Sequence, residues 1–181
     1  MRALERAPEE PSEVPELPSL EALYDEHFAF VWRSLRGLGV AQSQLDDATQ
    51  EVFVVVHRRG EEFERRSSVR TWLFAIAFRV AANFRRGAKR RAADPLSSEL
   101  ESEQPTPEQG AERAEMVHFV ERVLDGLEDG QRAAFTACIL EGMSAPEAAD
   151  ALGLNVNTLY SRLRAVRAKF ASALAKRDGR R

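Results

Sequence analysis

Residues 144–170 predict two helices joined by a tight turn, and this stretch limits the possible folds more than any other. Ser144 and Glu147 have the spacing of a capping box, in which each side chain satisfies a backbone N–H at the start of a helix. Gly153 suits the left-handed backbone that ends a helix, and Asn155 can then cap the next one. Two helices connected this closely are typical of a helix-turn-helix.

The second of these helices has one apolar side and one polar side. Its apolar residues recur at i, i+4, i+7 and i+11, so they form a single buried stripe. The stripe comprises Leu159, Leu163, Val166 and Phe170. The other side comprises Asn157, Tyr160, Ser161, Arg164 and Arg167, with Arg162 and Lys169 on its flanks. These donors suit phosphates and base edges, so the pattern predicts a DNA-facing helix; the alternative is an ordinary helical hairpin with a solvated basic side.

Two earlier helices, over residues 112–127 and 131–141, are expected to form the base on which the helix-turn-helix rests. The apolar residues of the first are Met116, Phe119, Val120, Val123 and Leu124. Those of the second are Ala134, Phe135, Cys138 and Ile139.

The formal net charge of -3 over 181 residues is unusual for a protein that binds nucleic acid, but the charges are segregated along the chain. Acidic residues gather in 1–26 and 92–115, whereas basic residues gather in 79–91 and 162–181. Local charge rather than net charge decides affinity for phosphates. The two basic segments are therefore candidates for phosphate contacts.

The first half of the chain predicts three further helices. Ser19 can cap the first, which ends near Gly37. The second carries Asp47, Gln50 and Glu51 at i, i+3 and i+4, so these side chains can face one partner together. The alternative for this acidic patch is solvated helix surface.

The third helix, predicted over residues 72–86, has the strongest pattern of the first half. Its core stripe comprises Leu73, Ile76, Ala77, Val80 and Phe84. On the other side Phe78 lies among arginines, which suits single-stranded DNA because aromatic rings stack on unpaired bases while arginines hold the backbone. The alternative is that Phe78 is buried against a neighbouring helix.

The remaining segments are poor in apolar residues. Residues 92–111 are predicted to be a flexible acidic linker, residues 1–18 a disordered leader and residues 177–181 a basic tail. The predicted fold class is therefore all-α. It consists of two small helical domains, residues 19–91 and 112–176, and the second contains the helix-turn-helix.

Several classes of protein find no support in the sequence. The single Cys138 lies among apolar residues and predicts a core position, and no histidine has a partner at metal-ligand spacing, so we expect no metal and no cofactor. The sequence offers no sign of an enzyme, because we find no paired carboxylates, no nucleophile with a base and no glycine-rich phosphate loop. Without a signal peptide or an apolar run long enough for membrane insertion, we expect a cytoplasmic protein.

Three segments together resemble a known family. LDDATQEVFVVV and FERRSSVRTWLFAIAFRVAANFRR resemble regions two-point-two to two-point-four of the extracytoplasmic-function (ECF) sigma factors. LEDGQRAAFTACILEGMSAPEAADALGLNVNTLYSRLRAVRAKF resembles their region four. The resemblance spans about residues 20–174, with both regions in family order around the acidic linker. It implies that residues 19–91 are region two and residues 112–176 are region four.

The resemblance implies an RNA polymerase sigma factor that directs core polymerase to specific promoters and assists promoter melting, and that is not an enzyme. Its partners would be core RNA polymerase, through the beta-prime coiled coil and the beta flap, promoter DNA and an anti-sigma factor. The residues implied for polymerase binding are Asp47, Gln50 and Glu51. Those implied for the minus-ten element are Phe63, Ser67, Trp72, Phe78, Arg79, Asn83, Arg85 and Arg86. Those implied for the minus-thirty-five element are Asn157, Thr158, Tyr160, Ser161, Arg162, Arg164 and Arg167.

A free-standing DNA-binding regulator is the main alternative, because it would use the same helix-turn-helix with residues 20–91 as a dimerisation or ligand module. The acidic face at Asp47 and the helix over residues 72–86 argue against it. A nucleic-acid enzyme finds less support. The chain departs from the family pattern at Arg65, Arg79, Tyr160 and Ala165, so the promoter sequence does not follow from the resemblance.

Overall fold

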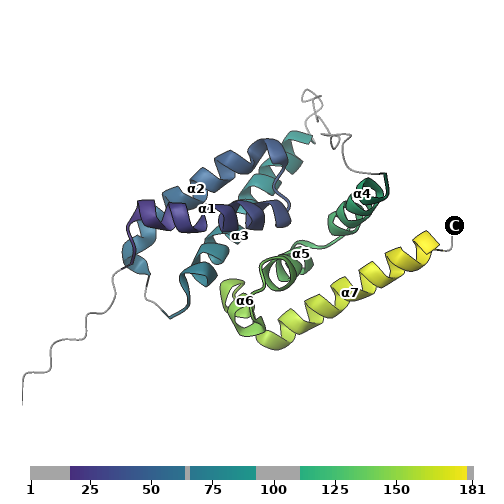
Figure 1. Ribbon diagram of the computed structural model, residues 1–181. Helices are drawn as coiled ribbons and strands as arrows, with labels where there is room; N and C mark the ends of the chain where they lie inside the picture. Colours follow the sequence, from purple (N-terminus) through teal and green to yellow (C-terminus); the bar gives the residue numbers. More distant parts are fainter. Residues whose placement is uncertain (1–16, 64–65, 93–110, 179–181) are drawn as a thin grey trace, which may run out of the picture.

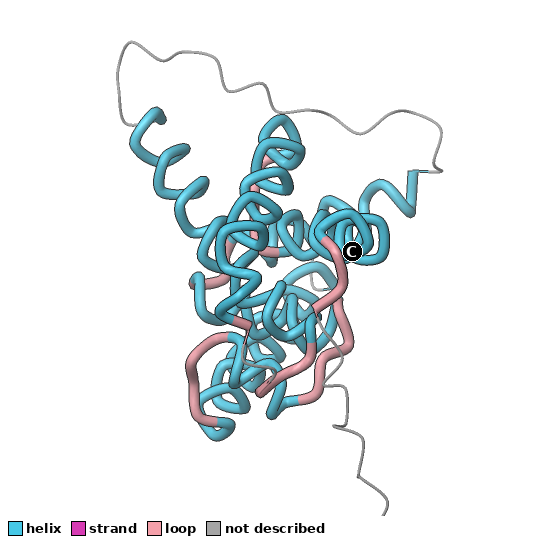
Figure 2. The backbone as a smooth tube through the Cα atoms, turned by 90° about the vertical axis from the view of Figure 1, so that its left-hand side faces the viewer, coloured by secondary structure: helices cyan, strands magenta, loops and turns pink. Residues whose placement is uncertain are grey.

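The computed structural model describes residues 17–63, 66–92 and 111–178, and every regular element in these ranges is a helix (Figure 1 and Figure 2). The predicted all-α fold class is confirmed. Residues 1–16 of the predicted leader, residues 93–110 of the predicted linker, Arg65 and residues 179–181 of the predicted tail lie outside the described residues.

The first unit contains three helices and two short 3₁₀ turns. These are α1 (Leu20–Gly37), η1 (Gln42–Gln44), α2 (Leu45–Arg59), η2 (Gly60–Glu62) and α3 (Val69–Ala92). Ser19 caps α1 as predicted, because its Oγ accepts the N–H of Ala22 at 3.2 Å. The side chains buried between the helices include Leu23, Val31, Leu35, Val52, Leu73 and Phe74. This shared core holds the exposed sides of α2 and α3 in one rigid body.

Helix α3 is longer than the helix predicted over residues 72–86. It begins at Val69 because Ser68 caps it, with the Ser68 Oγ accepting the N–H of Thr71 at 3.1 Å. It continues to Ala92, since arginine and lysine propagate helices well and positive charge is favourable near a helix C-terminus. The basic residues 85–91 are therefore held on a helix.

The second unit contains the helix-turn-helix. Its elements are α4 (Ala111–Asp125), α5 (Asp129–Phe135), η3 (Thr136–Leu140), α6 (Ala145–Ala151) and α7 (Val156–Asp178). The predicted capping box of Ser144 and Glu147 starts α6, and Gly153 has a φ of 63° in the turn before α7. Helices α5 and α6 both pack on α7, where Leu159 is fully buried. The predicted helix-turn-helix is confirmed as α6 and α7.

The helix expected over residues 131–141 is not regular. It widens at η3 into a π-turn, in which the N–H of Glu141 donates to the carbonyl of Thr136 at 3.0 Å. Ile139 lies within this wider turn, and it is 55% exposed instead of packing inward. The expectation for Ile139 was wrong because the apolar period of a sequence assumes regular hydrogen bonding.

The two units lie directly against each other. Helix α6 packs on α3 and η3 packs on α1, and α5 lies between the first unit and α7 (Figure 1). Ala134 and Ala148 belong to the same continuous hydrophobic core as Phe74 and Ala77. Helix α3 is thus covered by α1 and α2 on one side and by α6 on another. This second cover explains why Phe74, which the predicted stripe omitted, is fully buried.

Leu159→Ala should destabilise the chain strongly, because it removes a fully buried side chain from the start of α7. We expect the free energy of unfolding to fall by about 2 to 5 kcal/mol. Leu174→Ala is the matched control on the same helix, where the side chain is 42% exposed, and it should cost under about 1 kcal/mol. Urea unfolding followed by circular dichroism measures both, and equal losses would contradict this assignment of the core.

Candidate nucleic-acid interface

Helix α7 turns its polar side outward because its apolar stripe is held inside. Leu159 and Val166 are buried, and the ring of Phe170 stacks on Phe135 with centroids 5.6 Å apart. The predicted DNA-facing residues Asn157, Tyr160, Ser161, Arg164 and Arg167 are all exposed, Tyr160 to 53%. The structure thus brings these residues together on one outer face of α7.

The start of α7 is fixed by local hydrogen bonds. The Oδ1 of Asn155 accepts the N–H of Thr158 at 2.7 Å, which is the predicted cap and leaves Thr158 half-buried. The hydroxyl of Ser161 donates to the carbonyl of Asn157 at 3.0 Å. Because its single hydrogen is used within the helix, Ser161 can only accept from a base or a water.

Two flanking cations of α7 reach back to other helices. The guanidinium of Arg162 lies over Gly130, where an added Cβ would be 2.7 Å from the Arg162 Cζ. The Nζ of Lys169 donates to the carbonyl of Gly126 at 2.9 Å, just beyond the end of α4. Arg162 and Lys169 therefore also fasten α7 to its neighbours, a role that the helical wheel did not indicate.

The acidic face of α2 is exposed as expected. Asp47, Gln50 and Glu51 all point outward from the helix, and Gln50 borders a hollow of about 530 Å³ with Tyr24 and Phe53. The Tyr24 ring is 44% exposed, and its centroid lies 4.7 Å from that of Phe53. The face thus combines carboxylates with an accessible apolar edge. The sequence analysis did not predict that Tyr24 belongs to it.

A second hollow joins α2 to α3. Glu51 borders it from α2, and Arg79 and Asn83 border it from α3, both of them exposed. Residues assigned to polymerase and residues assigned to DNA therefore lie next to each other.

The aromatic residues assigned to the minus-ten element are partly engaged inside the protein. Trp72 and Phe63 are half-buried and tilt against each other with centroids 5.0 Å apart, and Ser67 is half-buried nearby in the chain. Phe78 is half-buried and packs against the core. Arg86 is exposed and donates to the Oδ1 of Asn83 one turn away.

Arg85 differs from the other basic residues of α3 because it faces the second unit. Its guanidinium pairs with Asp129 of α5 and donates to the carbonyl of Leu38 at 3.4 Å, and its side chain is only 18% exposed. The sequence shows no signal for this pairing, because the two residues are far apart along the chain and have no shared motif.

The described residues hold neither a membrane span nor a metal cluster. None of the helices in these ranges is long and apolar enough to cross a bilayer, and no three His, Cys, Asp or Glu side chains gather in them as ligands. Burial raises the pKa of the Cys138 thiol, which is half-buried against the core. A protonated thiol in such a place contributes packing.

Two family models match the sequence. The model for Sigma-70 region 2 matches residues 23–91, and that for Sigma-70, region 4 matches residues 120–170. The RNA polymerase sigma factor CnrH of Cupriavidus metallidurans is 30% identical over 162 residues, which are 84% of this chain and 84% of CnrH. The ECF RNA polymerase sigma factor SigE of Mycolicibacterium smegmatis is 30% identical over 163 residues, which are 88% of this chain and 63% of SigE.

Solved structures share the fold. CnrH in complex with the cytosolic domain of CnrY has a TM-score of 0.65 at 25% identity, covering 87% of this chain and 88% of CnrH. The sigma factor RpoE of Bartonella quintana, in complex with the anti-sigma factor NepR, has a TM-score of 0.65 at 22% identity. The match covers 84% of this chain and 96% of RpoE. The matches define the class as sigma factors, the proteins that give RNA polymerase its promoter choice. Within that class the chain belongs to the ECF sigma factors and acts in transcription initiation.

Ser144→Ala should raise the pKa of Glu147. The hydroxyl and the N–H of Ser144 donate to Glu147 at 2.6 and 2.9 Å and hold the pKa of its carboxyl below the ordinary value. A lowered folded-state pKa gives stability that is present above the ordinary carboxyl pKa and is lost as pH falls through the folded value. NMR titration of Glu147 measures the change. Glu21, whose pKa is lowered by its backbone and by Ser19, is the internal control and should not move; an unchanged Glu147 would contradict the capping box.

Proposed function

We propose that this sigma factor carries core RNA polymerase to its promoters through three surfaces. Region two, over residues 19–91, binds polymerase and the minus-ten element, and region four, over residues 112–176, binds the minus-thirty-five element. The observation that carries the proposal is the outward polar side of α7, which follows from the burial of Leu159 and Val166. The chain works in the cytoplasm and makes or breaks no bond itself.

The polymerase surface is the acidic face of α2. Asp47, Gln50 and Glu51 are exposed on adjacent turns and offer carboxylates to the coiled coil of the beta-prime subunit. The apolar edge at Tyr24 and Phe53 adds burial to this contact. Region four binds the beta flap in the same assembly, as in the family that the chain belongs to.

The minus-ten surface is α3 with the segment before it. Arg79 and Arg86 are exposed and suit the backbone of a melted strand, and Asn83 lies between them on the helix. The rings of Trp72 and Phe63 offer partly exposed faces for unpaired bases, with Ser67 beside them in the chain. Phe78 and Arg85 are each half-buried, so only part of each side chain is accessible on this surface.

The minus-thirty-five surface is the outer face of α7. Asn157, Tyr160 and Arg164 are exposed near its N-terminus and are suited to base edges in the major groove. Arg162 and Arg167 supply phosphate contacts, while Ser161 and the capped Thr158 bring acceptors and backbone close to the groove. Each surface alone gains few contacts, and tethering both to one polymerase multiplies their effective concentration.

The proposed regulator is an anti-sigma factor. Two sigma factors of the same fold, CnrH and RpoE, occur in complexes with CnrY and NepR. Exposed apolar side chains near the junction of the two units, including Met116, Val117 and Leu140, suit such a partner.

Transcription with purified core polymerase tests the proposal. Transcripts made on host genomic DNA should begin at a specific set of sites only when this protein is added. An unchanged set of start sites would contradict it. Tight promoter binding by the chain without polymerase would favour the free-standing regulator instead.

Arg164→Ala should relax base preference at one upstream position. If the exposed guanidinium makes a bidentate contact to a guanine, its loss costs about 1 to 3 kcal/mol on the preferred sequence and less on others. The matched control is Arg167→Ala, which should weaken all promoters alike as a phosphate contact. Holoenzyme binding to a randomised upstream element measures both variants. An equal loss of affinity on every sequence for Arg164→Ala would mean that Arg164 contacts a phosphate and not a base.

Asp47→Lys combined with Glu51→Lys should weaken binding to core polymerase, because it reverses charge on the proposed docking face. Circular dichroism should show an unchanged fold, since both side chains are exposed. The matched control reverses Glu115 and Glu121, two exposed carboxylates of α4, and should bind normally. Retention on immobilised core polymerase measures the binding of both double variants. Equal retention would contradict the assignment of the docking face to α2.

A further inference from the structure

A basic hollow lies within the second unit, between α4 and the C-terminal half of α7. Its volume is about 430 Å³, which falls within the roughly 300 to 1,000 Å³ that is usual for small-molecule sites. Four cationic side chains line it, and no carboxylate of the described residues does so. The four are Arg122 of α4 and Lys169, Lys176 and Arg177 of α7. We call this site the α4–α7 hollow.

The α4–α7 hollow also has an apolar floor. Phe119 and Val123 of α4 contribute to its lining from the core, and the half-buried Ala173 of α7 adds a small apolar surface between the two lysines. The guanidinium of Arg177 lies over the ring of Phe119, 5.6 Å from its centroid. A ligand in the hollow would therefore meet both an apolar surface and positive charge.

Two of the four cations are available to a ligand without breaking another contact. The side chains of Arg122 and Lys176 are exposed, and neither has an ion pair or a hydrogen bond with the described residues. Arg177 has only a distant ion pair, at 3.9 Å, with Glu115. The Nζ of Lys169 donates to the carbonyl that follows α4, so this cation neutralises the negative end of the helix next to the hollow.

The α4–α7 hollow faces away from the side of α7 that is proposed to bind DNA. Lys169, Ala173 and Lys176 recur at i, i+4 and i+7, so they form one stripe along the helix. With about 100° between successive residues, this stripe lies almost opposite the outer face that carries Tyr160 and Arg164. A DNA groove that holds the outer face therefore does not account for these lysines.

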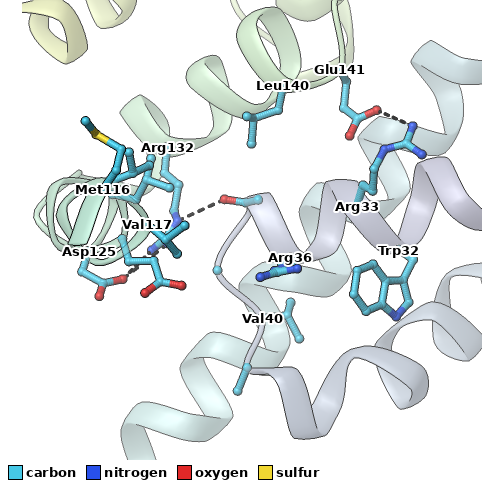
Figure 3. A pocket seen from close by; sticks show the side chains of 16 residues that line it. Trp32, Arg33, Arg36, Val40, Met116, Val117, Asp125, Arg132, Leu140 and Glu141 are labelled. Atoms are coloured by element: carbon cyan, nitrogen blue, oxygen red, sulfur yellow. Dashed lines mark hydrogen bonds and ion pairs between the residues drawn. The ribbon is translucent and has the colours of Figure 1, made fainter. Parts of the chain in front are cut away.

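The larger hollow between α1, α4 and η3 differs because its charges are balanced (Figure 3). Its volume is about 750 Å³, and three arginines and three carboxylates line it. Figure 3 shows Arg132 against Asp125 and Arg33 against Glu141. An anion gains little from cations that are already paired, so the excess of positive charge distinguishes the α4–α7 hollow.

We propose that the α4–α7 hollow binds an organic phosphate, a small molecule that carries several phosphate groups on an apolar or aromatic body. Arginine binds phosphate through two parallel hydrogen bonds, and lysine binds it as a point charge. Unbalanced positive charge in a hollow raises the local concentration of anions. The apolar floor suits the body of the ligand. The hollow lies apart from the proposed surfaces on α2, α3 and the outer face of α7, so the inference does not depend on the proposed function.

A carboxylate placed in the hollow should exclude the ligand. Ala173→Glu introduces one between the lysines, where it repels phosphate and pairs with the cations. The matched control is Ala175→Glu, which adds the same charge at an exposed position of α7 outside the lining. Circular dichroism should show an unchanged helical content in both variants.

Removal of cations tests the same site without adding a charge. Arg122→Gln with Lys176→Gln neutralises the two unpaired cations, both of which are exposed, so the fold should be kept. The matched control is Lys89→Gln with Arg90→Gln, which removes the same net charge from the end of α3. Should Ala173→Glu lose its fold, this double variant decides alone.

Calorimetric titration of the full-length chain with adenosine triphosphate (ATP) measures the affinity. The buffer contains about 150 mM salt, which screens exposed charges beyond about 8 Å, and no divalent cation. We expect one ATP per chain, and an affinity that falls about tenfold or more in Ala173→Glu and in the double variant but less than about twofold in their controls. No binding to the wild type, or equal losses in each variant and its control, would overturn the proposal.

Two further probes separate the phosphate groups from the body of the ligand. ATP should bind more tightly than inorganic tripolyphosphate, and adenosine should bind least. Equal affinities for ATP and tripolyphosphate would overturn the role of the apolar floor.

Nuclear magnetic resonance then locates the bound ATP. The amide signal of Gly126, which lines the hollow, should shift on addition of ATP, whereas that of Gly153 in the helix-turn-helix should not. A shift of Gly153 without a shift of Gly126 would place the nucleotide on the DNA-binding motif and overturn the site.

Discussion

The buried carboxylate of Glu141 is the interaction on which the arrangement of the two units depends. Only 2% of its side chain is exposed, and its charge is met by Arg33 and Arg70 from two helices of the other unit. Removing either arginine would leave this buried charge with a single partner. Glu141 lies between η3 and α6, and the pairing of Asp129 in α5 with Arg85 in α3 is a further ion pair between the same two units.

The fold converts a segregated charge pattern into separate surfaces. The net charge is -3, yet the exposed arginines of α7 and of the end of α3 form basic faces, while the carboxylates of α2 form an acidic one. A positive face attracts DNA and a negative face attracts a basic partner, regardless of the sum. In the proposed assignment, core polymerase meets the acidic face of α2 and promoter DNA meets the basic faces of α3 and α7.

The sequence predicted the elements whose signals are local. The caps at Ser19, Ser144 and Asn155, the left-handed Gly153 and the buried stripe through Leu159 all depend on residues within a turn or two, and the structure has each of them. The polar face of α7 follows directly from that stripe.

Features set by distant residues could not be predicted in this way. The second cover that buries Phe74 and the pairing of Arg85 arise from contact between the two units. The π-turn that contains the exposed Ile139 interrupts the regular hydrogen bonding that an apolar period assumes. The period of apolar residues along a helix predicts which side of that helix is buried in one core. It does not predict burial by a second unit that packs on another side of α3. The roles of Arg33 and Arg70 were missed for the same reason, since each is a surface arginine in its own helix.

The distance between the two units, in the free chain and on a promoter, tests the central claim most directly. Spin labels at Ala29→Cys in α1 and Ala171→Cys in α7, both exposed positions, can be placed in a Cys138→Ala background and measured by pulsed electron resonance. The account predicts one narrow distribution in the free chain and a different, longer one with core polymerase and promoter DNA. The same distribution in both states would contradict it.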